Sequence, residues 1–201
     1  MSAAVEGVEV ASAPDESLAG ILSDEAVAFV AELHRRFEPR RGDLLAARAE
    51  RDAELRAGGT LAFLDETRDV REDPSWRVPE PPADLRDRRV EITGPTDRKL
   101  MINALNSGAK TFMADLEDAN TPTWTNVIEG QRNIIDAVER TIAYDSEEDQ
   151  RHYELEEETA TLIVRPRGWH LHDRHVRVDG EPVAAALLDF GLFFFHCAQR
   201  L

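Results

Sequence analysis

The sequence predicts an α/β fold in which strands alternate with helices, and three short apolar runs support this prediction. The runs cover residues 90–94, 111–118 and 161–168. Each run alternates apolar and polar residues and has Gly, Pro or Asn close behind it, which is typical of a strand that leads into a loop. Helical patterns separate the runs. Crossovers of that length connect parallel neighbours, so we expect the three strands to form one parallel sheet.

Charged residues follow two of these runs at the point where each strand ends. They are Asp115, Glu117, Asp118, Arg165 and Arg167. The carboxyl ends of parallel strands meet at one edge of a sheet, where α/β folds bind ligands, so we expect these side chains to gather there. Residues two apart share a face of a strand, which pairs Asp115 with Glu117 and Arg165 with Arg167. From spacing alone, a salt-bridge network and a functional site explain the pattern equally well.

Composition and pattern divide the chain into four segments. Residues 1–20 have neither helical nor strand period, which predicts a disordered lead. Residues 21–60 carry two amphipathic patterns, which predict a helical hairpin that serves packing. Residues 61–88 contain four prolines and are expected to be an irregular connector. Residues 89–201 contain the three strands, with an acidic hairpin excursion expected near 144–158.

Start and stop signals define the predicted helices. Ser23 is a suitable N-cap for the first helix, which is expected to end before Pro39. The second helix is expected to end at Gly58. After the first strand, Pro95 is expected at or near the first helical position, where its missing N–H leaves no bond unmade.

Three further elements are predicted in the second half of the chain. Apolar residues recur at helical spacing over 125–142, and residues 179–180 (Asp-Gly) are typical of a tight hairpin turn. The last stretch, 183–201, is apolar over a broad stripe and is expected to be a well-buried helix. That stripe places Phe194 and Phe195 in the core.

The composition excludes some classes of partner. Among 201 residues, 40 are acidic and 24 are basic, which gives a formal charge of −16. Such a charge repels nucleic acids and anionic membrane surfaces, so neither is expected as a partner. The single cysteine, Cys197, excludes an internal disulfide and suits a reducing cytoplasm, which is the location that we expect. Oligomeric state is not predicted.

Five blocks of sequence closely resemble the A-type malate synthases, in that family's order and spacing. They are Ile-Thr-Gly-Pro-Thr-Asp-Arg-Lys at 92–99, Ile-Asn-Ala-Leu-Asn-Ser-Gly-Ala at 102–109, Phe-Met-Ala-Asp-Leu-Glu-Asp at 112–118, Pro-Thr-Trp at 122–124 and Val-Arg-Pro-Arg-Gly-Trp-His-Leu at 164–171. The resemblance extends from about residue 27 to the last residue.

The resemblance implies a (β/α)8 TIM barrel preceded by an N-terminal α-helical clasp. A full barrel typically needs ~250 residues, so this chain is expected to hold only the first strands, as a fragment. The resemblance also implies an acyltransferase, malate synthase, that condenses acetyl-CoA with glyoxylate and water to malate and CoA in the glyoxylate cycle.

The resemblance further implies roles for three residues. Arg165 matches the family's catalytic arginine, which orients glyoxylate and stabilises the enolate. Glu117 and Asp118 match acids near the family's Mg²⁺ and substrate, and are expected to support the pocket. The direct metal ligands and the catalytic aspartate of the family lie in later strands. A chain that ends at Leu201 is therefore expected to be inactive by itself.

Two alternatives stay open at this point. One is a citryl- or malyl-CoA lyase-like barrel enzyme, which shares the fold and a Leu-Glu-Asp strand end. The N-terminal clasp and the Arg-Pro-Arg-Gly-Trp-His block favour the synthase over this class. The other is a non-catalytic truncated product, because three strands cannot close a barrel and leave exposed edges.

Other residues that could carry chemistry have competing structural explanations. His170, His172 and His175, with Asp173, are compatible with a zinc centre, but Pro and Gly separate them from the strand and favour a structural role. Trp124 could stack on a ligand or pack on the core, and its position beside a strand end favours packing.

Overall fold

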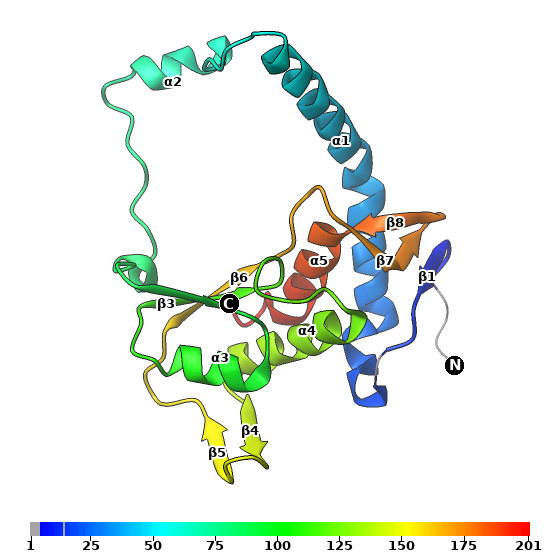
Figure 1. Cartoon of the computed structure of the whole chain (residues 1–201), viewed down its shortest axis with the longest axis vertical. Helices are drawn as coiled ribbons and strands as arrows, with labels where there is room; N and C mark the ends of the chain where they lie inside the picture. Colours follow the sequence, from blue (N-terminus) through cyan, green and yellow to red (C-terminus); the bar gives the residue numbers. More distant parts are fainter. Residues whose placement is uncertain (1–4, 14) are drawn as a thin grey trace.

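Figure 1 shows the computed structural model, which describes residues 5–13 and 15–201. Buried apolar side chains form two hydrophobic cores. In chain order the elements are β1 (Val8–Val10), η1 (Glu16–Leu22), α1 (Asp24–Arg56), η2 (Asp65–Thr67), α2 (Arg68–Glu72), η3 (Ala83–Leu85), β2 (Glu91–Gly94), α3 (Arg98–Leu105), β3 (Thr111–Asp115), α4 (Trp124–Val138), β4 (Ala143–Ser146), β5 (Arg151–Glu154), β6 (Thr161–Arg165), β7 (His172–Val178), β8 (Glu181–Ala184) and α5 (Ala185–Cys197).

The three predicted strands form one parallel sheet in the order β2-β3-β6, which confirms the α/β prediction. The register places Asp115, the last residue of β3, opposite Arg165, the last residue of β6. Within the described part of the chain these strands form an open sheet and do not close into a barrel. The carboxyl edge of the sheet is therefore the place where the charged residues meet.

Helices α3 and α4 are the crossovers between these strands. Each begins at a side-chain cap: Asp97 accepts the N–H of Leu100 at 2.9 Å, and Thr123 accepts that of Asn126 at 3.2 Å. Pro95, expected at or near the first helical position, lies two residues before the cap Asp97. The fully buried side chains of this core include Phe112, Met101, Ile102, Leu116 and Ile134, each worth about 1.5–3 kcal/mol of burial.

The N-terminal segment is ordered over most of its length, so the prediction of a disordered lead is wrong there. β1 pairs antiparallel with β7, and η1 buries Leu18 and Ile21 in the core. A three-residue strand is too short to show a period in sequence, and its pairing partner lies about 168 residues further along the chain. The rest of the predicted lead, residues 1–4 and 14, lies outside the described residues.

The predicted helical hairpin is instead one helix, α1, of 33 residues with Pro39 inside it. A proline removes the bond to the carbonyl four residues earlier, here that of Arg35. Both residues are exposed, so water can take the place of the lost donor. Ser23 caps the start of the helix as predicted, and the helix ends just before Gly58, whose φ is +97°.

After α1 the chain leaves the rest of the molecule. In Figure 1 the segment that contains α2 runs in a wide arc from the end of α1 to the start of β2. Its large apolar side chains are exposed, among them Leu61, Phe63, Leu64, Trp76 and Val78. Further along, β4 and β5 pair as an antiparallel hairpin within residues 143–154, in the acidic stretch where an excursion was expected.

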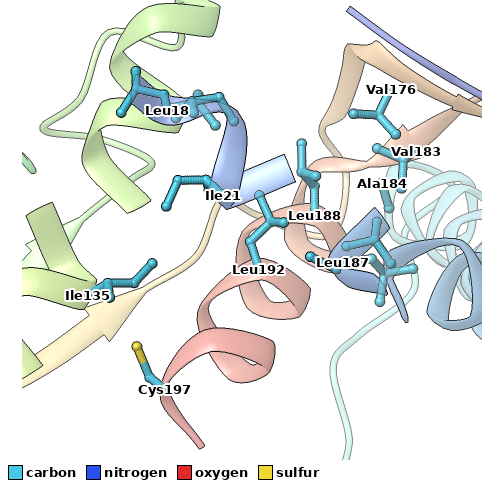
Figure 2. Packing of buried hydrophobic residues seen from close by; sticks show 14 residues of the cluster. Leu18, Ile21, Ile135, Val176, Val183, Ala184, Leu187, Leu188, Leu192 and Cys197 are labelled. Atoms are coloured by element: carbon cyan, nitrogen blue, oxygen red, sulfur yellow. The ribbon is translucent and has the colours of Figure 1, made fainter. Parts of the chain in front are cut away.

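A second sheet, β1-β7-β8, packs with α5, α1 and α4 around the other core (Figure 2). The predicted turn joins β7 to β8, with Asp179 and Gly180 at φ +52° and +88°. Gly191 lets α5 approach α1, since a Cβ there would meet Val30 Cγ2 at 2.9 Å.

Helix α5 is less buried than predicted. Leu187, Leu188 and Leu192 face the core, but Phe194 and Phe195 are 44% and 41% exposed. A helix that is apolar on all sides has more apolar surface than one core can cover, so the sequence could not show which side faces inward.

Among the described residues, no helix has the length and apolar character that crossing a membrane requires.

Candidate active site

The side chain of Arg165 lies at the carboxyl edge of the parallel sheet, among the three acids that follow β3. Its NH1 lies 3.3 Å from Asp115 Oδ2 and 2.7 Å from Asp118 Oδ2. Its NH2 donates to Glu117 Oε2 at 2.9 Å. The structure therefore brings together four of the five charged residues that the strand pattern predicted to meet.

Asp115 shapes the loop that presents the other two acids. Its Oδ1 accepts the backbone N–H groups of Glu117 and Asp118, at 2.9 and 3.2 Å, and its Oδ2 accepts that of Ala119 at 3.2 Å. Its side chain is almost fully buried, whereas those of Glu117 and Asp118 are 18% and 72% exposed. Asp115 is thus a structural residue, and Glu117 and Asp118 are the acids that a ligand can reach.

The cluster has more negative than positive charge. Three carboxylates surround one guanidinium, which gives a formal charge of −2. The hydrogen bond to Asp118, followed by the charges of the neighbouring carboxylates, raises the pKa of Arg165 above its ordinary value. Arg165 therefore keeps its charge at any working pH, and its side chain is 37% exposed.

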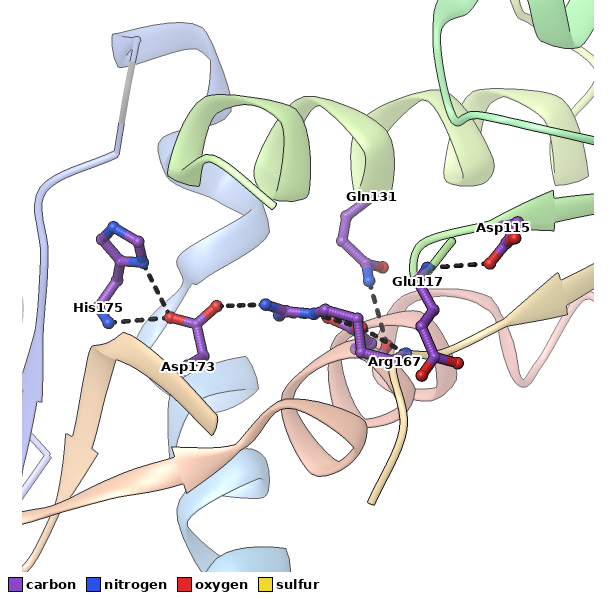
Figure 3. A network of polar contacts seen from close by, with 7 residues as sticks. Asp115, Glu117, Gln131, Arg167, Asp173 and His175 are labelled. Carbon is purple, nitrogen blue, oxygen red and sulfur yellow. Dashed lines mark hydrogen bonds and ion pairs between the residues drawn. The ribbon is translucent and has the colours of Figure 1, made fainter. Parts of the chain in front are cut away.

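The pairing of Arg167 with these acids, predicted from the strand pattern, is wrong. Its Nε and NH2 donate to Asp189 of α5 at 2.9 and 2.7 Å, and its NH1 donates to Asp173 of β7 at 2.8 Å (Figure 3). Strand β6 ends at Arg165, and Pro166 turns the chain, so strand alternation does not extend to Arg167. Asp189 was missed, although one acid inside an apolar helix is a signal of a buried ionic partner.

Burial and charge act in opposite directions on this second cluster. Burial alone would raise the pKa of Asp173, but the charge of Arg167 and the bonds from His175 and Arg167 lower it below its usual value. Burial raises the pKa of Asp189 despite its bonds to Arg167. Likewise, burial alone would lower the pKa of Arg167, but its carboxylate partners raise it. The arginine and both acids are buried, which identifies a structural network.

Trp124, His172 and His175 have structural partners. Trp124 donates from Nε1 to the Ser12 carbonyl at 2.9 Å and stacks on His175 with 4.8 Å between ring centroids. His172 contacts Arg41, and His175 contacts Asp173. In the part of the chain that the structure describes, no group of three His, Cys, Asp or Glu side chains could hold a metal ion. Burial raises the pKa of the Cys197 thiol to about 11, so it is no nucleophile.

A cavity of about 640 Å³ opens beside the acidic loop, between η1, α4 and the turn that follows β2. Residues 119–121, which directly follow the acids, line one side of it. Thr96 and Asn120 also line it, and each has a buried polar atom without a hydrogen-bond partner among the described residues. The charged cluster is thus next to a polar cavity that is large enough for part of a substrate.

The fold and the cluster define a parallel α/β protein whose charged residues gather at the carboxyl edge of the sheet, as in barrel and open-sheet enzymes. Two family models match the chain: the malate synthase N-terminal domain over residues 6–69, and the malate synthase TIM barrel domain over residues 161–201. The chain belongs to the malate synthase family.

Curated relatives agree with this assignment. The chain is 56% identical to malate synthase of Streptomyces clavuligerus over 185 residues, which is 90% of this chain and 34% of the relative. It is 54% identical to malate synthase of Myxococcus xanthus over 194 residues, 96% of this chain and 36% of the relative. It is 48% identical to the glyoxysomal malate synthase of Cucumis sativus over 95% of this chain. The chain spans about a third of the length of these relatives.

Proposed function

We propose that the protein to which this chain belongs is an A-type malate synthase, which condenses acetyl-CoA with glyoxylate and water to give malate and CoA. The observation that supports this best is the partly exposed guanidinium of Arg165. It lies at the ligand-binding edge of the sheet in a chain of this family. Its bond to Glu117, at 2.9 Å, holds the guanidinium in one orientation.

The proposed reaction needs a positive group where negative charge develops. Removal of a proton from the acetyl methyl group creates an enolate oxygen, and a base must accept that proton. Arg165 is suited to stabilise this oxygen, because it stays charged and its planar fork can bridge a carboxylate and an oxyanion. The catalytic aspartate that the resemblance implies is expected in a later part of the barrel.

We also propose that Glu117 and Asp118 support a Mg²⁺ ion. Each has one carboxylate oxygen that is not used by Arg165, and the cluster has a formal charge of −2. One or two carboxylates are enough for Mg²⁺, because it keeps several waters. When bound, the ion would supply positive charge that holds the glyoxylate oxygens. The rest of its ligands would come from later strands.

The proposed function also gives each segment of the chain a role. We propose that residues 21–60 form the N-terminal clasp, that residues 61–88 connect it to the barrel, and that the barrel begins near residue 89. β2 and β3 lie outside the two matched regions, but β3 pairs directly with β6, which lies inside the barrel match. We propose a reducing compartment such as the cytoplasm, because Cys197 is free and buried in this chain.

The test is an assay of CoA thiol release by the product of the gene that encodes this chain. Acetyl-CoA plus glyoxylate should release CoA, and Arg165→Lys should lower turnover by at least ~10²-fold, the scale of losing one oxyanion donor. Arg174→Lys, at an exposed arginine of β7, is the matched control and should keep normal turnover.

Two results would contradict the proposal. Cleavage of malyl-CoA without condensation would assign the protein to the lyase-like class. Near-normal turnover by Arg165→Lys would remove Arg165 from the mechanism.

A further inference from the structure

Helix α1 reaches the loop that follows β6 through one buried arginine, Arg41. Its Nε donates to the carbonyl of Trp169 at 2.6 Å, and its NH2 lies 2.9 Å from Nε2 of His172. Its NH1 donates to Glu38 of the same helix at 2.6 Å. All three guanidinium nitrogens therefore have partners, and the residue is only 5% exposed. Two of these partners lie outside the helix: Trp169 in the loop, and His172 where the loop joins β7.

On its other side the same loop touches the charged cluster. A Cβ added to Gly168 would lie 2.6 Å from Glu117 Oε1, so this carboxylate rests directly against the loop backbone. The other oxygen of Glu117, Oε2, accepts from Arg165 at 2.9 Å. The backbone at residues 168–169 thus lies between Arg41 on one side and the carboxylate that holds Arg165 on the other.

The loop is attached to the rest of the chain at three points. At its start, the N–H of Arg167 donates to Asp189 Oδ2 at 2.9 Å, which ties the loop to α5. Arg41 supplies the second anchor, at Trp169 and His172. A bond within the loop, from the Leu171 N–H to the Gly168 carbonyl at 3.0 Å, completes the turn between the anchors. A third attachment is the Ala185 N–H of α5, which donates to the Leu171 carbonyl at 3.0 Å. Without Arg41, the backbone at Gly168 and Trp169 would be held only by the anchors at Arg167 and Leu171.

We propose that Arg41 is a positioning residue: it fixes the loop 168–172 so that Glu117 holds the guanidinium of Arg165 in one orientation. The N-terminal helix thereby contributes to the site and does not serve packing alone. The catalytic consequence rests on the function proposed above, whereas the effect on the orientation of Arg165 does not.

Nuclear magnetic resonance on the 201-residue chain tests the positioning role of Arg41 and does not require enzymatic turnover. The Nε–H resonance of Arg165 is assigned by its loss in Arg165→Lys. Arg41→Ala should shift that resonance and should speed hydrogen exchange at the Leu171 amide by about 10-fold, since charge-assisted bonds at the second anchor are lost.

Arg35→Ala is the matched control, because it removes another arginine of α1. Arg35 pairs with Asp179 at 2.8 Å and does not touch the loop, so neither signal should change. If Arg41→Ala unfolds the chain, Arg41→Lys decides, because it keeps the charge but has one nitrogen in place of three. An unchanged Arg165 resonance and an unchanged Leu171 exchange rate in the folded Arg41 variant would overturn the proposal.

Kinetics add a second measurement on the active protein. Arg41→Ala should lower kcat by about 10-fold, while the KM for acetyl-CoA stays the same. A normal kcat beside a shifted Arg165 resonance would overturn the positioning role. Absence of turnover in the unaltered protein would overturn the proposed function instead, and the resonance measurement would still decide the role of Arg41.

Discussion

Two arginines that are two residues apart in the sequence have opposite environments. Arg165 is 37% exposed and lies among three acids at the edge of the parallel sheet. Arg167 is 5% exposed and is paired with Asp173 and Asp189 between β7 and α5. The residue types are the same in both clusters. Burial is what separates a site that a ligand can reach from a network that holds elements together.

The largest expected effect concerns stability. Arg167→Ala leaves two buried carboxylates without their counter-charge and should destabilise the fold by about 3–5 kcal/mol. Arg165→Ala should have a smaller effect, because the pair with exposed Asp118 contributes little and the buried Asp115 keeps its three backbone N–H bonds. Urea unfolding of both variants measures the difference. Equal losses of stability would mean that burial does not distinguish the two clusters.

Low pH should lower the stability of the fold through Asp173, which belongs to the buried cluster around Arg167. The folded pKa of this carboxyl is lowered, so its contribution to stability is complete above its unfolded pKa of about 4 and is lost as pH falls through the folded value. Asp173→Asn should remove this part of the acid sensitivity. Free energies of unfolding at several pH values between 5 and 3 provide the measurement. Parallel curves for the variant and the unaltered chain would contradict the assignment.

The smallest expected effect on stability is that of changing Asp118, the exposed acid beside Arg165. Asp118→Asn lowers the negative charge beside Arg165 without disturbing a buried group, so the unfolding free energy should stay nearly unchanged. Mg²⁺ affinity should fall by about 10-fold, the scale of losing one supporting carboxylate. Titration calorimetry with Mg²⁺ on the active protein measures it. Unchanged affinity would leave Glu117 as the metal-supporting acid.

Local patterns predicted much of the fold. Alternation over short apolar runs identified β3 and β6, and the Asp-Gly pair identified the β7–β8 turn. The Arg165 cluster followed from the rule that parallel strands end at one edge. These predictions succeeded because each depends on residues that are neighbours in the sequence, or on a repeated backbone geometry.

Other features depended on distant partners and were missed. Val8–Val10 is a strand because β7 offers it an edge. Helix α1 continues through Pro39 because the lost bond faces water. Nothing near Arg167 in the sequence indicates that Asp189 will lie against it. The signal was the lone acid in an apolar helix, which marks a buried pair but does not name the partner.

The sequence by itself determined the three parallel strands, the turn chemistry and the set of charged residues that can meet at the edge of the sheet. Tertiary structure decided which arginine is buried, which acids each one pairs with, and that Arg41 of the N-terminal helix contacts the loop beside Glu117. The physical reason is that the cost of burying a charge depends on partners supplied by other elements, and packing alone brings those elements together.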